Sequence, residues 1–187
     1  QAALGERSAL LGWLDAQVTP DSLLSWAYVI RKKGPVVWVR LDAEAAARLA
    51  SGNLPSSPAD LRMASLLRLA IGWYRHLVDV EAPARSLEHL AKAVSAARVR
   101  PVLPLLDGID DLVVVPSWVS AFFPVESLVD DGGQPLGDRF CVSYTPSATV
   151  YSWLRERAAA QAGARGDGGP RAAAGRVLLL GDPPFRL

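Results

Sequence analysis

Three residues could supply nucleophile-and-base chemistry: Cys141, the sole cysteine, and the two histidines, His76 and His89. A cysteine nucleophile needs its base within hydrogen-bond reach of the thiol. Cys141 lies inside a short apolar run, residues 140–144, where a small, buried and unreactive thiol is the usual state. Both histidines lie beside the polar stripes of expected helices, as surface or boundary residues do. The sequence therefore predicts no catalytic residue in this chain, and catalysis by Cys141 is the disfavoured alternative.

Metal and phosphate sites are not expected either. The adjacent carboxylates at residues 110–111 and 130–131 lack the further ligands that a metal site needs, so loop or helix-cap duty is favoured. The glycines of residues 163–169 are followed by no lysine, unlike those of a P-loop. Asp182 follows an apolar run, where open α/β sheets place ligand groups, but a turn is the better interpretation. We therefore expect no cofactor and no metal.

A strand that runs directly into a helix occupies residues 139–157. Residues 140–144 are aromatic, β-branched or small and apolar, which is typical of a buried strand. Thr145 can cap the helix, and Pro146 fits the first helical position, where its missing N–H has no intrahelical partner. One face of this helix is expected to carry Val150, Tyr151, Leu154 and Ala158.

The flanking segments predict an α/β fold. Residues 4–17 suggest a short helix, and residues 22–41 suggest a β-hairpin with a basic, glycine-containing loop. Trp26 and Trp38 are then expected to be core or cross-strand partners. Residues 112–115 form an unbroken apolar run, typical of a strand covered on both faces in a parallel sheet.

Helices and loops are expected between and after these strands. The clearest helix covers residues 58–78, where apolar residues recur every three or four positions and an arginine row marks a solvated face. The other expected helices are at residues 42–50, 84–98, 101–106 and 124–129, and the expected loops are at residues 51–58, 130–137 and, as a disordered linker, 161–175.

Three segments together resemble the CHAT domain family of caspase-like cysteine peptidases. The strand ending in SYTPSA, with the helix that begins TVYSWL, resembles one element of that family. Residues 110–131 look like its preceding strand, proline and short helix, and residues 176–185 like its next strand and turn. The resemblance covers most of residues 20–187. Catalysis in that family needs a His in a segment like HxATHG and a Cys in one like LSACET, and this sequence contains neither segment.

The resemblance implies a caspase-like (pseudo-caspase) α/β fold, with a mixed, mostly parallel sheet flanked by helices and preceded by a β-hairpin. Residues 1–20 would be a helical lead-in from upstream helical repeats. Residues 21–187 would be the non-catalytic N-terminal portion of a bacterial CHAT-type peptidase, with a flexible linker at residues 161–175. Its partners would be a downstream His–Cys half, attached or processed, together with the upstream repeats and a protein substrate. Defence or cell-death signalling is a family-level expectation, and the alternative is a scaffold module without peptidase activity.

Composition limits the other classes of function. With 187 residues, half of them hydrophobic, the chain is long enough for one domain with a substantial core. A formal net charge of +1 removes the electrostatic argument for nucleic-acid binding. One cysteine forms no internal disulfide, and no apolar run approaches the roughly 20 residues of a membrane span, so we expect a cytoplasmic protein. Gln1 is an unusual natural start, so the chain is expected to be an excised or processed piece.

The apolar residues 177–180 carry one more expectation. Burial of four aliphatic side chains contributes roughly 6 to 12 kcal/mol gross, which is comparable to the whole stability of a domain. A strand of this composition needs neighbours on its faces and its edges. We therefore expect the segment that follows Leu187 to pack against it.

Overall fold

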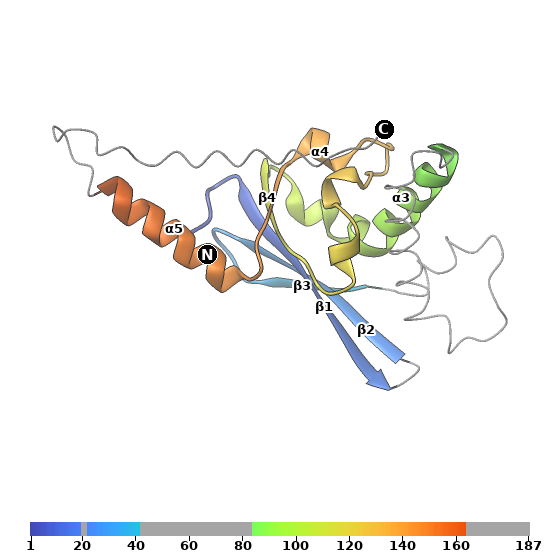
Figure 1. The fold of residues 1–187 in the computed structure, drawn as a ribbon, viewed down its shortest axis with the longest axis horizontal. Helices are drawn as coiled ribbons and strands as arrows, with labels where there is room; N and C mark the ends of the chain where they lie inside the picture. Colours follow the sequence, from blue (N-terminus) through green and yellow to red (C-terminus); the bar gives the residue numbers. More distant parts are fainter. Residues whose placement is uncertain (20–21, 42–83, 164–187) are drawn as a thin grey trace, which may run out of the picture.

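A five-stranded mixed sheet, with strand order β3-β2-β1-β4-β5, organises the residues that the computed structural model describes, 1–19, 22–41 and 84–163 (Figure 1). The central strands β1 (Ser8–Thr19) and β4 (Asp111–Val115) are parallel. On one side β2 (Ser22–Arg31) pairs antiparallel with β1 and with β3 (Val37–Leu41), and on the other β5 (Cys141–Tyr144) pairs parallel with β4. Only β2 therefore opposes the other four strands in direction. The predicted α/β class, with a mixed sheet flanked by helices, is confirmed.

The helix predicted over residues 4–17 is wrong, because β1 is a central strand of the sheet. Ala9, Leu10 and Leu11 are consecutive and all buried, since both faces of this part of β1 are covered. Such a strand loses the alternation of polar and apolar residues that marks a half-exposed strand. Gly12 admits the ring of Tyr28, which a Cβ at this position would overlap. The domain boundary expected at residue 20 falls between two paired strands, β1 and β2.

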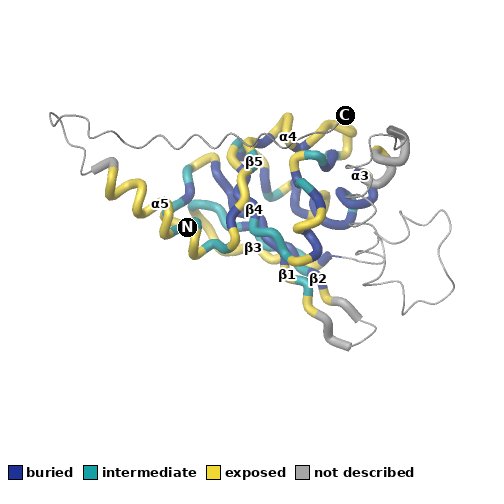
Figure 2. The backbone as a smooth tube through the Cα atoms, in the orientation of Figure 1, coloured by how far each residue is buried: buried dark blue, intermediate teal, exposed yellow. Residues whose placement is uncertain are grey.

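The first face of the sheet carries the main hydrophobic core. It is covered by α3 (Ala84–Arg98), then by the 3-10 helices η1 (Arg100–Leu106), η2 (Ser120–Phe122) and η3 (Val125–Ser127), and by α4 (Leu136–Arg139). The expected helices at residues 84–98, 101–106 and 124–129 are thus confirmed, the last two as short 3-10 turns. Gly108, with φ 71°, adopts the left-handed conformation after η1 that favours glycine. Figure 2 shows this face as the deeply buried part of the molecule.

The second face is covered only in part, by α5 (Ala148–Gly163) and the N-terminal segment. Ala148 and Tyr151 of α5 pack with Leu4, Leu10 and Val113. The rest of α5 projects past the sheet, and its tube is exposed along most of its length (Figures 1 and 2). The apolar face expected for this helix is therefore only partly used.

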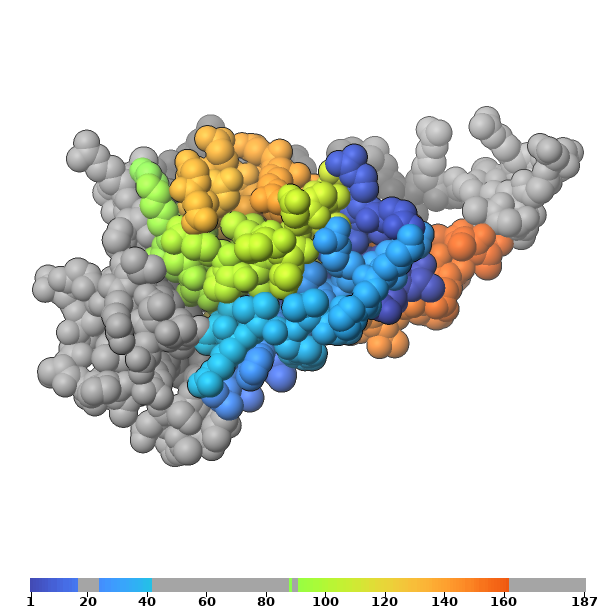
Figure 3. Space-filling model, turned by 180° about the vertical axis from the view of Figure 1, so that it is seen from behind, coloured from blue at the N-terminus to red at the C-terminus, as the bar shows by residue number. Residues whose placement is uncertain are grey.

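The predicted β-hairpin is confirmed as β2 and β3, but it belongs to the sheet and does not precede it. Figure 3 shows it in light blue across the back of the molecule, beside the yellow-green residues that include η1. Trp38 lies across from Tyr28, with ring centroids 5.0 Å apart, and Trp26 lies across from Arg40. Trp38 is 51% exposed, so it is not a core residue; it is a cross-strand partner, as expected, but of Tyr28 and not of Trp26.

The strand and helix at residues 139–157 form as predicted, but their burial and their cap differ. β5 is an edge strand among the described residues, and three of its four side chains are exposed. The helix begins two residues later than expected, because the hydroxyl of Ser147 accepts the Val150 N–H at 3.1 Å and caps it. Thr145 instead donates its hydroxyl proton to the Ser147 carbonyl.

Several predicted segments lie outside the described residues. They are the helices at 42–50 and 58–78, the loop at 51–58, residues 164–175 of the linker and the strand and turn at 176–185. Residues 161–163 of the expected linker form the last turn of α5. Within the described ranges, no helix has the length and apolar character needed to cross a bilayer.

Candidate functional site

Cys141 is the first residue of β5, and its side chain is exposed, so the prediction of a buried thiol is wrong. The reason is topological: β5 is the outermost described strand on its side, whereas the sequence suggested an inner one. Val142 packs against the core of the first face, so alternation along the strand directs Cys141 to the second face.

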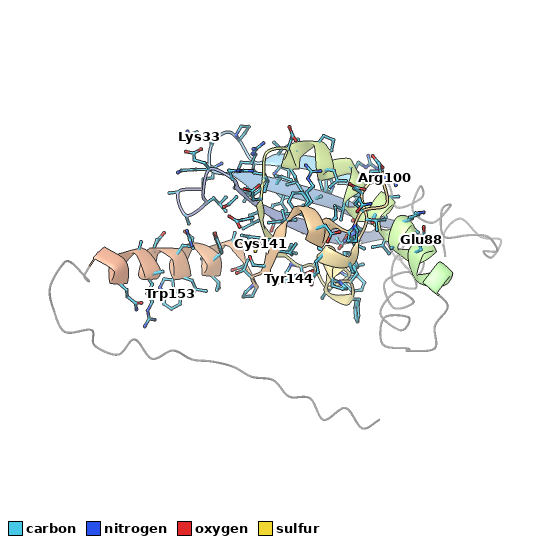
Figure 4. The ribbon with its side chains drawn as sticks, turned by 90° about the horizontal axis from the view of Figure 1, so that it is seen from above. Lys33, Glu88, Arg100, Cys141, Tyr144 and Trp153 are labelled. Atoms are coloured by element: carbon cyan, nitrogen blue, oxygen red, sulfur yellow. The ribbon has the colours of Figure 1, made fainter. Side chains whose placement is uncertain are left out.

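The structure does not bring Cys141 together with a histidine. His89 belongs to α3, which covers the first face, opposite to the side of the sheet that Cys141 faces. Figure 4 shows Glu88, the neighbour of His89 in α3, far along the molecule from Cys141. His76 lies outside the described residues. Among the described residues, therefore, no pair is assigned as thiol nucleophile and imidazole base.

The adjacent carboxylates have structural partners. Asp110 forms an ion pair with Arg7 at 2.6 Å, and the Asp111 carboxylate accepts a hydrogen bond from Ser8. Asp130 accepts the N–H groups of two residues in its own turn, and Asp131 pairs with Arg100 at 2.5 Å. No group of three or more His, Cys, Asp or Glu side chains in the described ranges could hold a metal ion. Asp182, and the phosphate-loop candidate beyond Gly163, lie outside those ranges.

A buried ion pair lies in the carboxyl-terminal half of β1, where sequence reasoning placed nothing. Arg98, the last residue of α3, donates two hydrogen bonds to the Asp15 carboxylate of β1. They run from Nη1 to Oδ1 at 2.8 Å and from Nη2 to Oδ2 at 2.7 Å. The side chains of Arg98 and Asp15 are 2% and 0% exposed, respectively. Such a bidentate geometry is the strongest form of an arginine–carboxylate pair.

Three serines complete the ion pair, and we call the five residues together the Asp15–Arg98 cluster. Ser25 of β2 and Ser117, which follows β4, each donate a hydroxyl proton to the Asp15 carboxylate, and each accepts a hydrogen bond from Arg98. Ser120 accepts the Ser117 N–H at 2.6 Å. The cluster therefore joins the end of α3 to β1, β2 and the turn that follows β4.

Aromatic residues close the cluster on one side. The Trp13 indole N–H donates to the Arg98 carbonyl at 3.1 Å, and the Arg98 guanidinium lies 5.8 Å from the Trp13 ring centroid. Phe123 meets Trp13 edge to face at 6.2 Å. Arg98 Nε is buried without a hydrogen-bond partner among the described residues. The guanidinium is thus held by its two terminal nitrogens and by an aromatic face.

The pKa of the Asp15 carboxyl is lowered. Burial alone would raise the pKa of this group, but the hydrogen bonds and charge of Arg98, with the Ser117 and Ser25 hydroxyls, outweigh the cost of desolvation. Asp15 is therefore ionised, and the pair carries no net charge. Both Asp15 oxygens accept hydrogen bonds from Arg98 and the serines, so the cluster has a structural role: it holds α3 against β1 and β2.

A second set of hydrogen bonds holds the end of β5. The Tyr144 hydroxyl donates to Glu126 Oε2 at 2.5 Å and accepts the Val125 N–H at 2.7 Å. Burial, and then the negative charge and hydrogen bond of Glu126, raise the pKa of this hydroxyl. Tyr144 is therefore neutral and supplies no phenolate. Its hydroxyl links β5 to η3.

A sequence signal for the Asp15–Arg98 cluster was present. Residues 9, 11, 13 and 15 share one side of β1, and the first three are buried and apolar, so Asp15 occupies an inward position. Arg98 likewise follows Ala97 in the buried part of α3. An acid and a base that both fall on inward positions predict a buried ion pair, because an unpaired buried charge is too costly. Because residues 4–17 were predicted as a helix, the alternation of inward and outward positions along β1 was not recognised.

Comparisons with protein-family models, with curated proteins and with solved structures find no match to this chain.

Proposed function

We propose that this chain is the non-catalytic N-terminal half of a bacterial CHAT-type, caspase-like cysteine peptidase. In this role it supports a downstream half whose His and Cys cleave protein partners. The observation that carries the proposal is the order of elements from β4 to α5. A buried parallel strand, a turn containing Pro116, short helices, a second parallel strand and a long helix follow one another, as the resemblance implies.

The finer, caspase-like description of the sheet belongs to the same proposal. The mixed sheet, with four strands in one direction and helices on both faces, supports it. So do the buried Asp15–Arg98 cluster on β1 and the half-exposed Tyr144 hydrogen bonds at the end of β5, since a supporting half must hold its strands rigidly. A cytoplasmic location, upstream helical repeats and a role in defence or cell-death signalling are further parts of this proposal.

The non-catalytic role is supported by the placement of Cys141. The exposed thiol on the second face has no imidazole partner among the described residues, and its cross-strand neighbour is the carboxylate Asp111, not a histidine. A downstream half would then supply the thioester-forming cysteine and its histidine.

Peptide hydrolysis by two forms of the protein tests the proposal. One form is the 187-residue chain alone, and the other is the chain joined to its natural continuation. We expect the short form to cleave no peptide, and the long form to show cleavage that thiol reagents abolish. Replacement of the cysteine in an LSACET-like segment should remove that activity, whereas the matched control Cys141→Ala should retain it.

Two results would overturn the peptidase proposal. One is thiol-sensitive cleavage by the 187-residue chain alone, which would place the nucleophile in this half. The other is a continuation that contains neither an HxATHG-like nor an LSACET-like segment and has no hydrolytic activity.

The alternative function is a protein-interaction scaffold without peptidase activity. Three exposed indoles favour it, because large aromatic side chains on a surface are enriched at binding sites. They are Trp38, Trp118 and Trp153, which are 51%, 49% and 55% exposed. An inactive long form that still retains a protein partner through these indoles would support the scaffold.

A further inference from the structure

One flank of α5 exposes three large apolar side chains. Val150, Trp153 and Leu154 are 37%, 55% and 50% exposed. Figure 4 shows Trp153 on the side of α5 that points away from the sheet. At 100° per residue, these three side chains share an arc distinct from the one that Ala148 and Tyr151 direct into the second face. We call these three residues the outer flank of α5.

The outer flank is not the solvated side of a surface helix. A helix that packs on one layer carries a single apolar stripe and is polar elsewhere. On α5, the polar side chains of Thr149, Ser152 and Glu156 occupy a separate arc, which leaves apolar residues facing two directions. Arg157 follows on the same arc, one turn further along α5, with its guanidinium 5.5 Å from the Trp153 ring centroid. A helix with two apolar sides is suited to lie between two layers.

The topology limits where a further parallel strand could join the sheet. The connections that lead from β3 to β4 and from β4 to β5 both include helices on the first face, and both advance across the sheet toward β5. Parallel crossovers have a fixed, right-handed sense. A connection over the second face, where α5 lies, therefore leads back from β5 toward β4, and those positions are already filled. A further parallel strand that is reached by way of α5 would therefore not extend the sheet at the described edge of β5.

The sequence beyond α5 supplies an apolar segment within reach. Residues 177–180 read VLLL, and 13 residues, 164–176, separate them from the end of α5. An extended tether of this length spans roughly 40 Å, whereas α5, with 16 residues, is about 24 Å long. The segment can therefore return alongside any part of the helix. A tether of this kind also gives a high effective concentration.

We propose that residues 177–180 dock on the outer flank of α5, so that α5 lies between the described sheet and a second layer that this segment begins. The inference rests on the proposed function in taking this segment as the start of the downstream half. It adds the surface on which the two halves meet. The driving force is the removal of the Trp153, Leu154 and Val150 side chains and of the aliphatic segment from water.

Disulfide trapping in the 187-residue chain tests this docking. In a Cys141→Ala background, which removes the sole native thiol, Leu154→Cys is combined with Leu179→Cys. The matched control combines Glu156→Cys with Leu179→Cys, because Glu156 is exposed at nearly the same height on the opposite side of α5. Mild oxidation at low protein concentration, tryptic cleavage of the tether and a non-reducing gel measure the rate of cross-linking.

We expect the Leu154 pair to cross-link about tenfold faster than the Glu156 pair, because docking raises the local concentration on one flank only. Adding Trp153→Asp should bring the faster rate down to that of the control, with circular dichroism confirming that α5 is retained. Equal rates for the two pairs, or a fast rate that Trp153→Asp leaves unchanged, would overturn the docking.

Failure of the docking and failure of the proposed function give different results. Equal cross-linking rates together with thiol-sensitive cleavage by the long form would remove the docking surface and leave the peptidase. Fast cross-linking at Leu154 with an inactive long form would retain the docking surface within a scaffold.

Discussion

The two faces of the sheet differ in how completely they are covered. On the first face, α3, α4 and three 3-10 helices bury a continuous core. The buried charges of Asp15 and Arg98 are paired with each other there. On the second face a small cluster lies under the first turn of α5, while Trp38 and the outer flank of α5 stay exposed. The first face is therefore complete within the described residues. The second face is covered only in part and leaves large apolar side chains exposed.

The largest effect that tests this comparison is expected from Arg98→Ala on the first face. The substitution leaves the Asp15 carboxylate buried without its cation, which costs about 3 to 5 kcal/mol for buried pairs of this kind. Denaturant unfolding of the variant measures the loss. The matched control is Arg100→Ala, whose ion pair with Asp131 is exposed and should contribute less than about 1 kcal/mol.

The double variant Asp15→Leu with Arg98→Met sharpens the same test. Apolar residues of similar volume remove both charges together, so the double variant should be more stable than Arg98→Ala. If it were as unstable as the single variant, the cluster would act through its serine hydrogen bonds and not through charge balance.

The next largest effect is expected from acid, which should lower the free energy of unfolding through Asp15 on the first face. The pKa of Asp15 is lowered in the folded protein, so the ionised form contributes stability above the ordinary pKa of about 3.9. That contribution is lost as the pH falls through the lower pKa of the folded state. The free energy of unfolding should therefore drop below about pH 4, and Asp15→Asn should flatten this drop.

Glu6 is the control for the acid experiment. Its pKa is also lowered, by hydrogen bonds from Lys33 and Lys32, but the group is fully exposed. Salt screens exposed pairs far more than buried ones. Added salt should therefore remove the effect of Glu6→Gln on the pH profile and leave that of Asp15→Asn.

A smaller loss is expected from Tyr144→Phe at the end of β5. The substitution removes the hydroxyl that joins Glu126 to the Val125 N–H, and one such hydrogen bond contributes about 1 kcal/mol. Thermal unfolding measures the change. Because Tyr144 is half-exposed, water can take the place of the lost hydroxyl as a hydrogen-bond partner. A loss well above about 1 kcal/mol would mean that the Tyr144 hydroxyl also orders η3.

Sequence reasoning succeeded where local signals agreed with the final packing. The hairpin at β2 and β3 and the buried strand β4 were predicted because period, turn residues and flanking prolines all pointed the same way. The fold class followed from the alternation of these strands with α3. In these elements the residue pattern itself indicates which side chains are buried and which are exposed.

Sequence reasoning failed where burial depends on neighbours that are distant in the chain. The residues of β1 read as a helix because both faces are buried, and β5 read as an inner strand because its residues do not show that it is an edge. The Asp15–Arg98 cluster joins residues 83 positions apart, so neither charge could be explained alone. The exposed thiol of Cys141 follows from the same error about β5.

The smallest effect is expected from Cys141→Ala on the second face. An exposed side chain at the start of an edge strand contributes little to packing, so the free energy of unfolding should change by less than about 0.5 kcal/mol. The native thiol should also react with a thiol reagent as completely as in denaturant, because it is open to solvent. Slow labelling of the native chain would mean that Cys141 is covered, and the second face would then be more completely covered than this comparison states.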